Sequence, residues 1–247
     1  MSDPRARFFG GGDYTDGLSP SNRKLLLAAF VKGELYDTAR DMLDSASREQ
    51  INIVKDILKP TIGRWDFLLQ GHHLWEYFVK QKDGTQLWRT SDHDLAEWLE
   101  APYLGQPGPD MQSAYVVYSF PAGEKGGARP ELGLYAVHGQ GGGKTFSGPL
   151  GQLEGMMRAF TADIYYVAHH HKLVAARAVK LSEATDAETS LVATDSLLVA
   201  GGSWLRGYMP NEVTYAEAGL MVPLAMGAPV ISAHRRKNGT FKLRVEL

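Results

Sequence analysis

The chain has 247 residues, of which 44% are hydrophobic and 22% are charged, and its formal net charge is −2 at pH 7. A chain of this length and composition can bury a full core, so we expect a single α/β domain over residues 1–247. The small net charge excludes a bulk electrostatic attraction to nucleic acid. Because the sequence has no cysteine, it excludes disulfides and thiolate metal sites, and a bound metal must be held by histidine and carboxylate.

The sequence shows no targeting or membrane-spanning segment. Residues 1–7 lack the apolar core of a signal peptide, and no later stretch has the roughly 18 apolar residues that a membrane span needs. We therefore expect a cytoplasmic protein that does not enter a membrane. Its oligomeric state is not indicated by the sequence.

The first sixty residues predict a short strand and two helices. Residues 7–9 are a brief apolar lead into a glycine-rich loop, so we expect a strand that stops just before Asp13. Ser19 followed by Pro20 is typical of a helix start, because serine caps the first turn and proline is tolerated at its first position. Apolar residues at helical spacing predict a second helix over 38–58, and a proline two residues later ends it.

A strand over 65–70 follows and ends in two histidines. Further along, acidic residues near the start of 91–99 predict a charged helix between loops. We expect His93, within this helix, to lie at the surface and not to bind metal. An apolar strand over 115–120 is predicted next, and 121–130, rich in glycine and charge, is expected to be a hairpin-like or disordered connection.

Beyond residue 172 the pattern predicts strands alone. The candidate strands are 173–181, 191–200, 214–220 and 229–234. Asn238-Gly239 is the strongest hairpin-turn signal in the chain, because both residues tolerate positive φ.

Two short apolar runs at the centre of the chain each end in histidine. They are 134–137, before His138, and 164–168, before His169. Buried parallel strands show this pattern, and sites of α/β proteins lie at the carboxyl ends of such strands. An extended backbone would send His169 and His171 to one face and His170 to the other. Converging imidazoles indicate a metal site, and a run of solvated histidines is the plain alternative.

A glycine-rich turn over 139–145 resembles a phosphate-binding P-loop. The match fails, because the first glycine of that motif is replaced by His138. Backbone N–H groups in such a turn can still face a phosphate, so Lys144 remains a candidate substrate contact.

Four motifs with aspartate or histidine follow predicted strand ends. They are Gly12-Asp13-x-x-Asp16, Gly71-His72-His73, His138-Gly139 and Ala168-His169-x-His171. In this order the set resembles the calcineurin-like metallophosphoesterases, and the resemblance spans about residues 10–171. It implies a four-layer αββα sandwich, here with the N-terminal strand missing or truncated. It also implies metal-dependent hydrolysis of a phosphomonoester, phosphodiester, nucleotide or nucleic acid by a metal-activated water.

The resemblance assigns roles to the matching side chains. Asp13 would be the carboxylate that bridges two metals, and His72, His138 and His169 would complete the shell of the first metal. His73 matches the family histidine near the leaving group, where an imidazole can donate a proton. His72 stands where the family has asparagine, and imidazole binds transition metals more strongly than an amide, so the metal preference should change. Mn²⁺ is the expected ion, and Zn²⁺, Fe²⁺ or Ni²⁺ also suit these ligands.

The sequence departs from the family pattern in two further ways. Leu74 stands where an acidic residue usually follows and orients His73, and Asp16 is expected to fix the loop or cap a helix. No Asp-x-His pair precedes Asp13, so the second metal position keeps only Asp13 and His171. We therefore expect one tight metal site and a weak or empty second one.

Three explanations of the missing pair remain open. The chain begins inside a longer natural phosphoesterase, or the protein works with one metal, or it is a catalytically impaired module that binds metal, phosphate or a partner.

The substrate is poorly marked. Tyr14, Lys144 and Arg206 are the candidate substrate contacts, and Arg206 lies in an aromatic and basic segment that equally suits an ordinary loop. The basic residues 234–237 at the predicted hairpin tip make nucleic acid a possible partner, but a solvated tip explains the same residues.

Overall fold

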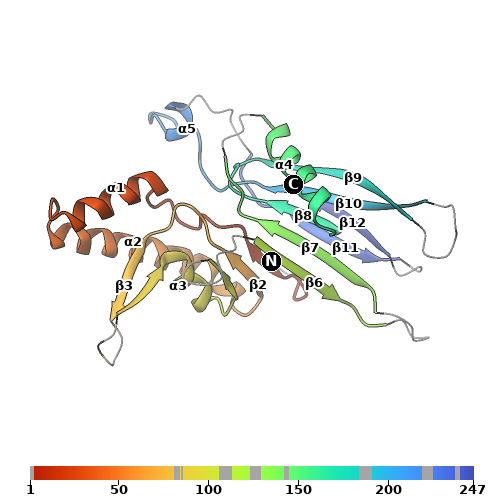
Figure 1. Ribbon diagram of the computed structural model, residues 1–247, viewed down its shortest axis with the longest axis horizontal. Coiled ribbons are helices and arrows are strands. Elements are labelled where there is room, and N and C mark those ends of the chain that lie inside the picture. The colour runs from red at the N-terminus through yellow and green to blue at the C-terminus, as the bar shows by residue number, and fades with distance from the viewer. Residues whose placement is uncertain are drawn as a thin grey trace. The chain divides into compact units, whose positions relative to one another are not determined.

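The computed structural model describes residues 3–80, 84, 86–105, 113–122, 129–141, 145–183, 191–218, 225–236 and 240–247. Within these ranges the chain has the mixed α/β structure that the sequence predicts (Figure 1). The Cα positions group into two compact units, Met1–Ser113 and Ala114–Leu247. One domain over 1–247 stays a prediction. None of the helices in the described part of the chain is long and apolar enough to cross a membrane.

The first unit contains a three-stranded sheet in the order β1-β2-β5, in which both neighbouring pairs are parallel. The elements of this unit are β1 (Phe8–Gly10), α1 (Pro20–Val31), α2 (Asp37–Leu58), the 3₁₀ helix η1 (Lys59–Thr61), β2 (Trp65–Leu69), β3 (Glu76–Lys80), β4 (Gln86–Thr90), α3 (Ser91–Trp98) and β5 (Tyr103–Leu104). Strands β3 and β4 form a separate antiparallel ladder. The loops after β1 and β2 leave the sheet at the same edge, because these strands run in parallel.

The core of the first unit lies between the sheet and two helices. Leu68 of β2 is fully buried and packs in one cluster with Ile51 of α2 and with Leu95 and Leu99 at α3. Hydrophobic burial therefore fixes the strand whose end carries His72.

The second unit is built on a five-stranded sheet in the order β6-β7-β8-β10-β9. Its elements are β6 (Ser113–Ser119), β7 (Glu131–Val137), α4 (Ser147–Ala159), β8 (Ile164–Val167), β9 (Leu173–Glu183), β10 (Leu191–Gly201), α5 (Tyr215–Ala218), β11 (Val230–Arg235) and β12 (Phe241–Glu246). Strands β7, β8 and β10 run in parallel, and β9 is antiparallel to β10. Strands β11 and β12 form a separate antiparallel ladder.

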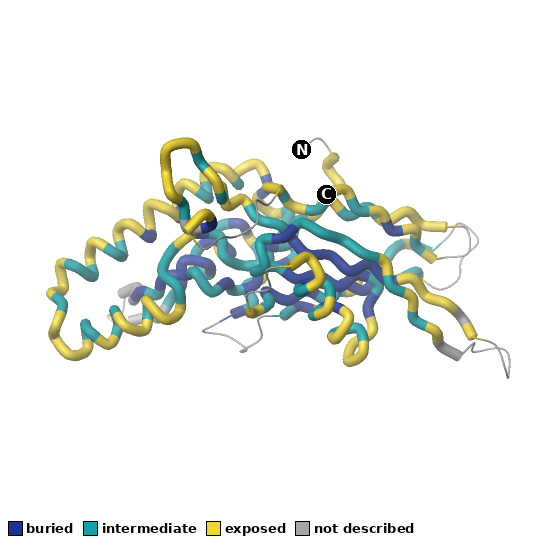
Figure 2. The backbone as a smooth tube through the Cα atoms, turned by 90° about the horizontal axis from the view of Figure 1, so that it is seen from above, coloured by how far each residue is buried: buried dark blue, intermediate teal, exposed yellow. Residues whose placement is uncertain are grey.

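The centre of this sheet is the most buried part of the unit (Figure 2). Leu153 of α4 packs on Tyr165 and Val167 of β8 and on Leu198 of β10. In the β7–β8 pairing Val137 lies opposite Val167, so the two strands end level with each other. The residues that follow them therefore emerge side by side.

Most of the predicted elements are confirmed. Helix α1 begins at Pro20 with Ser19 as its cap, and the side chain of Ser19 accepts a hydrogen bond from the Asn22 N–H (3.4 Å). Helices α2 and α3 and strands β2, β6, β7, β8, β9, β10 and β11 lie within a few residues of their predicted ranges. Strand β1 has only three residues, Phe8–Gly10, and lies within a residue of the predicted strand over 7–9.

The prediction of a strand over 214–220 is wrong. Residues Tyr215–Ala218 form helix α5 instead, and 219–224 lie outside the described residues. The hydroxyl of Thr214 accepts a hydrogen bond from the N–H of Glu217 (3.2 Å), which is the arrangement of a helix N-cap. A Thr-x-x-Glu sequence favours a helix start, and the alanines and the glutamate that follow Thr214 are strong helix formers.

The segments on either side of the predicted 91–99 helix, which were expected to be loops, contain three strands, β3, β4 and β5. Strands of two or five residues are too short to show a clear alternation of apolar and polar residues in the sequence. Whether such a segment forms a strand therefore depends on the strand with which it pairs. Residues 123–128 of the predicted 121–130 connection, and the Asn238-Gly239 turn, lie outside the described residues. The antiparallel β11–β12 ladder on either side of that turn confirms the predicted hairpin pairing.

Candidate functional site

In the first unit, Asp13 ties the loop after β1 to the loop after β2. Its Oδ1 accepts hydrogen bonds from the backbone N–H groups of His72 and His73, the second at 2.9 Å. A Cβ at Gly71 would lie 2.0 Å from the Asp13 nitrogen, so only glycine allows this approach. The aspartate and the two histidines that the sequence singled out are therefore brought together.

The imidazole of His73 has a carboxylate beside it. Its Nδ1 lies 3.3 Å from Oδ1 of Asp16, and their side chains are 36% and 80% exposed. Asp16 therefore stands next to His73 although Leu74, which is 1% exposed, replaces the family's acidic residue. Asp16 was expected to fix the loop or to cap a helix: Ser19 caps α1 instead, and the loop-fixing role stays a prediction.

In the second unit, His138 and His169 lie together at the ends of β7 and β8. Their ring centroids are 5.2 Å apart, and each offers a ring nitrogen within 4.8 Å of the other. His138 is fully buried, and His169 is half-buried. Gly139 has φ 91°, and a Cβ there would lie 2.6 Å from Cγ2 of Val167, so glycine is needed for the turn after His138. Two imidazoles at this spacing can share one metal ion.

The predicted alternation of His169, His170 and His171 along a strand is wrong. Strand β8 ends at Val167, and His169 and His171 have left-handed backbones with φ 62° and 55°. Side chains alternate only along extended backbone, and these two residues turn the chain instead. Among the described residues, His171 does not join His138 and His169 in a group of close ligand atoms.

His170 is engaged by helix α4. Its Nε2 lies 2.9 Å from Oε1 of Gln152, and burial, followed by the nearby charge of Lys172, lowers the pKa of His170. Burial also lowers the pKa of Lys172, which is 6% exposed. The lowered pKa of His170 favours its neutral imidazole.

The three candidate substrate contacts have different surroundings. Tyr14 donates its hydroxyl to the carbonyl of Leu69 (2.9 Å) and packs against the core of the first unit. Arg206 is exposed in the loop after β10, and Lys144 lies outside the described residues. The packing of Tyr14 gives it a structural role, and contact with a substrate stays a prediction for all three.

The sequence did not single out two residues that hold the histidine-bearing loop. Asp92, which is 1% exposed, accepts a hydrogen bond from the Gly71 N–H at Oδ2 (2.8 Å), and Arg23 donates to the carbonyl of His72 (3.0 Å). In the sequence, Asp92 is one of several acidic residues near the start of the predicted 91–99 helix, and nothing indicated that it binds another loop. No local pattern marks Arg23, because its partners lie 49 and 51 residues away in the chain.

His93 is also less exposed than the sequence suggested. It is half-buried and stacks on Tyr103, with ring centroids 5.0 Å apart. Burial, followed by the nearby charge of Arg89, lowers the pKa of His93.

Comparison with known proteins identifies no relative: no protein-family model, curated protein or solved structure matches this chain.

Proposed function

We propose that this protein is a metal-dependent phosphoester hydrolase with the αββα sandwich fold of the calcineurin-like metallophosphoesterases. The observation that supports this most is the pair formed by His138 and His169 at level ends of two parallel strands. Neutral imidazoles so placed are suited to Mn²⁺, Zn²⁺, Fe²⁺ or Ni²⁺. A cytoplasmic location belongs to the same proposal, since a chain without cysteine has no need of an oxidising compartment.

We further propose that Asp13 and His72 join His138 and His169 as ligands of one tightly held ion. A second position, with Asp13 and His171, would be weak. When bound, the metal supplies a Lewis acid for the phosphoryl oxygens and lowers the pKa of a water. Hydrolysis would join a water oxygen to phosphorus and break the bond from phosphorus to the leaving oxygen, and one proton of that water would pass to solvent.

His73 is proposed to protonate the leaving oxygen. Oδ1 of Asp16 lies 3.3 Å from Nδ1, so an Nδ1–H can donate to this carboxylate and orient the ring, and Nε2 of the protonated ring would carry the proton that passes to the leaving oxygen. A side chain that is 36% exposed can exchange its proton with solvent between turnovers.

The test uses the full chain with Mn²⁺ and two nitrophenyl substrates, a phosphodiester and a phosphomonoester. We expect turnover of at least one of them, and we expect His138→Ala to abolish it. His234→Ala is the matched control, because this exposed histidine on β11 lies far along the chain from the proposed ligands. If no turnover occurs with Mn²⁺, Zn²⁺, Fe²⁺ or Ni²⁺, the hydrolase proposal is wrong.

The second candidate function is a non-catalytic module that binds metal or phosphate. It is favoured by one observation, namely that Oδ1 of Asp13, the proposed bridging carboxylate, already accepts hydrogen bonds from the backbone N–H groups of His72 and His73. Metal binding by His138 and His169 without turnover of any tested ester would support this second function.

A further inference from the structure

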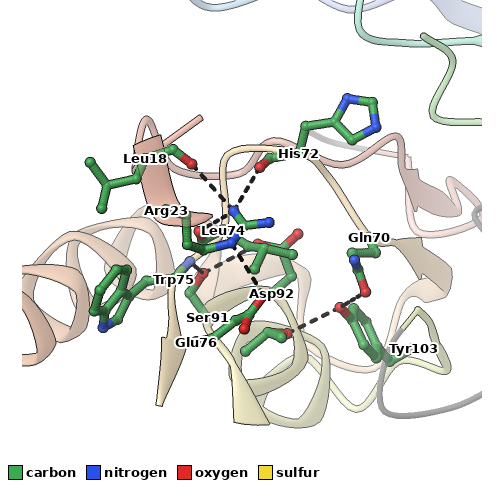
Figure 3. Close-up of polar contacts among 11 residues, drawn as sticks. Leu18, Arg23, Gln70, His72, Leu74, Trp75, Glu76, Ser91, Asp92 and Tyr103 are labelled. Carbon is green, nitrogen blue, oxygen red and sulfur yellow. Dashed lines mark hydrogen bonds and ion pairs between the residues drawn. The ribbon is translucent and has the colours of Figure 1, made fainter. Parts of the chain in front are cut away.

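The loop 71–75, here called the histidine loop, is held through nearly all of its backbone polar groups, and Figure 3 shows its contacts with Arg23 and Ser91. Its N–H groups donate from Gly71 to Asp92, from His72 and His73 to Asp13, and from Trp75 to the hydroxyl of Ser91 (3.1 Å). Its carbonyls accept from Arg23 at His72 and Leu74, from the Gly17 N–H at His73 (3.2 Å), and from the Ser91 N–H at Trp75 (2.9 Å). Such extensive pairing selects one loop conformation.

Arg23 of α1 holds the carbonyls on both sides of His73. Its Nη1 donates to the carbonyl oxygens of Leu18 (3.3 Å), His72 (3.0 Å) and Leu74 (2.9 Å). Its Nε lies 3.2 Å from Oε1 of Glu76, and the side chains of Arg23 and Glu76 are 13% and 21% exposed. The guanidinium is thus largely enclosed and charge-balanced, and its donors are directed at backbone. Hydrogen bonds from such a charged donor are about twice as strong as neutral ones.

These contacts join the two loops that carry the proposed acid and its carboxylate partner. Leu18 ends the loop that contains Asp16, and His72 and Leu74 flank His73. Because one guanidinium binds both loops, it determines how far the imidazole of His73 lies from Asp16. Lysine has the same charge but lacks the planar fork, so it cannot hold all these groups at once.

We infer that Arg23 is a positioning residue for proton donation by His73. The inference rests on the proposed function, because the donated proton goes to the leaving oxygen of a phosphoester. Arg23 acts only through the histidine loop. A displacement of about 1 Å at a reacting group can reduce a rate about 100-fold, so a small movement of this loop is sufficient.

The experiment compares Arg23→Lys with Arg64→Lys in the full chain with Mn²⁺. Arg64 is the matched control, because it also donates to backbone carbonyls, those of Asp3 (2.7 Å) and Ala6 (2.8 Å), but not in the histidine loop. Each variant is assayed on two phosphate esters, one with nitrophenol and one with an unactivated alcohol as leaving group. A good leaving group needs little proton donation, whereas a poor one depends on it.

We expect Arg23→Lys to lower kcat about 10- to 100-fold for the poor leaving group and less than about threefold for nitrophenol, with KM little changed. His73→Ala should show the same dependence on leaving group, and Arg64→Lys should show none. Equal losses of kcat on both esters in Arg23→Lys would mean that Arg23 only maintains the fold, which would overturn the inference.

A second measurement does not depend on activity. Amide hydrogen exchange at His72, His73 and Trp75 should accelerate in Arg23→Lys, because their hydrogen bonds require the loop to stay in place, and should not change in Arg64→Lys. If the wild-type chain hydrolyses no ester, the hydrolase proposal fails. Accelerated exchange would then still support Arg23 as the residue that positions His73, and unchanged exchange would overturn it.

Discussion

Three of the five residues to which the sequence assigned a metal have positive φ. In the described part of the chain, the residues other than glycine with positive φ are Asp13, Glu100, His169, His171 and Asn211. Three of these five are proposed ligands. A left-handed backbone costs such residues of order 1–3 kcal/mol and persists only where surrounding structure enforces it. The concentration of this strain at Asp13, His169 and His171 supports a functional role for both loops.

His93 should make the stability of the fold depend on pH. Burial and the charge of Arg89 lower its pKa in the folded chain, so the unfolded chain takes up the proton more readily. The contribution of neutral His93 is therefore complete above the ordinary pKa of 6.5 and is lost as the pH falls below it. We expect the free energy of unfolding, measured with urea, to fall less between pH 7.5 and pH 5 in His93→Gln than in the wild type.

The control for this measurement is His234→Gln, which changes an exposed histidine on β11. The charge of Glu97 acts against the other two causes, but it is the smallest of the three. The same pH dependence in His93→Gln and the wild type would show that His93 is not held neutral by its surroundings.

At the scale of elements, Thr90 connects β4, α3 and β5. Its hydroxyl accepts from the His93 N–H (3.1 Å) as the N-cap of α3, and it lies 3.1 Å from the Tyr103 hydroxyl. Burial is the main cause that raises the pKa of Tyr103, so this hydroxyl stays protonated and needs a partner. We expect Thr90→Ala to lower the free energy of unfolding by about 1–2 kcal/mol in urea titrations.

The variant Thr90→Ser keeps the hydroxyl and removes the methyl group, so it separates the contributions of these two groups to stability. Serine caps a helix as well as threonine does, so this variant should keep most of the stability. An equal loss in both variants would show that packing of the methyl group, not the cap, matters at Thr90, which is 2% exposed.

At the scale of the whole molecule, binding of the proposed metal ion should stabilise the folded chain. A ligand that binds only the folded chain stabilises it, by about 2.7 kcal/mol at 100 times its Kd. We therefore expect Mn²⁺ to raise the Tm of the wild type, and His138→Ala and His72→Ala each to abolish most of this rise.

His72→Asn should reduce the metal-dependent rise only in part, because an amide oxygen is a weaker ligand for a transition metal. His170→Ala is the matched control and should keep the rise, since its Nε2 is engaged with Gln152. A full rise in His72→Ala would show that the second unit binds the ion alone. Two equally tight equivalents in metal analysis would contradict the assignment of a weak second position.

The sequence alone determined the elements whose signals are local. Ser19 and Pro20 marked the start of α1, and the apolar runs before His138 and His169 marked β7 and β8, because caps and continuous apolar strands depend on neighbouring residues only. It also placed the histidines at strand ends, which follows from the strand boundaries. The helix over Tyr215–Ala218 was missed although its Thr-x-x-Glu cap is local, because four residues are too few to show the helical spacing of apolar side chains.

Only the tertiary structure decided features that join distant residues. The β3–β4 ladder depends on pairing, and the left-handed turn at His169 and His171 departs from the extended backbone that their sequence position favoured. The contacts of Arg23 and Asp92 with the histidine loop span between 21 and 51 residues. No periodicity or motif encodes such contacts, because they form only when packing brings the segments together.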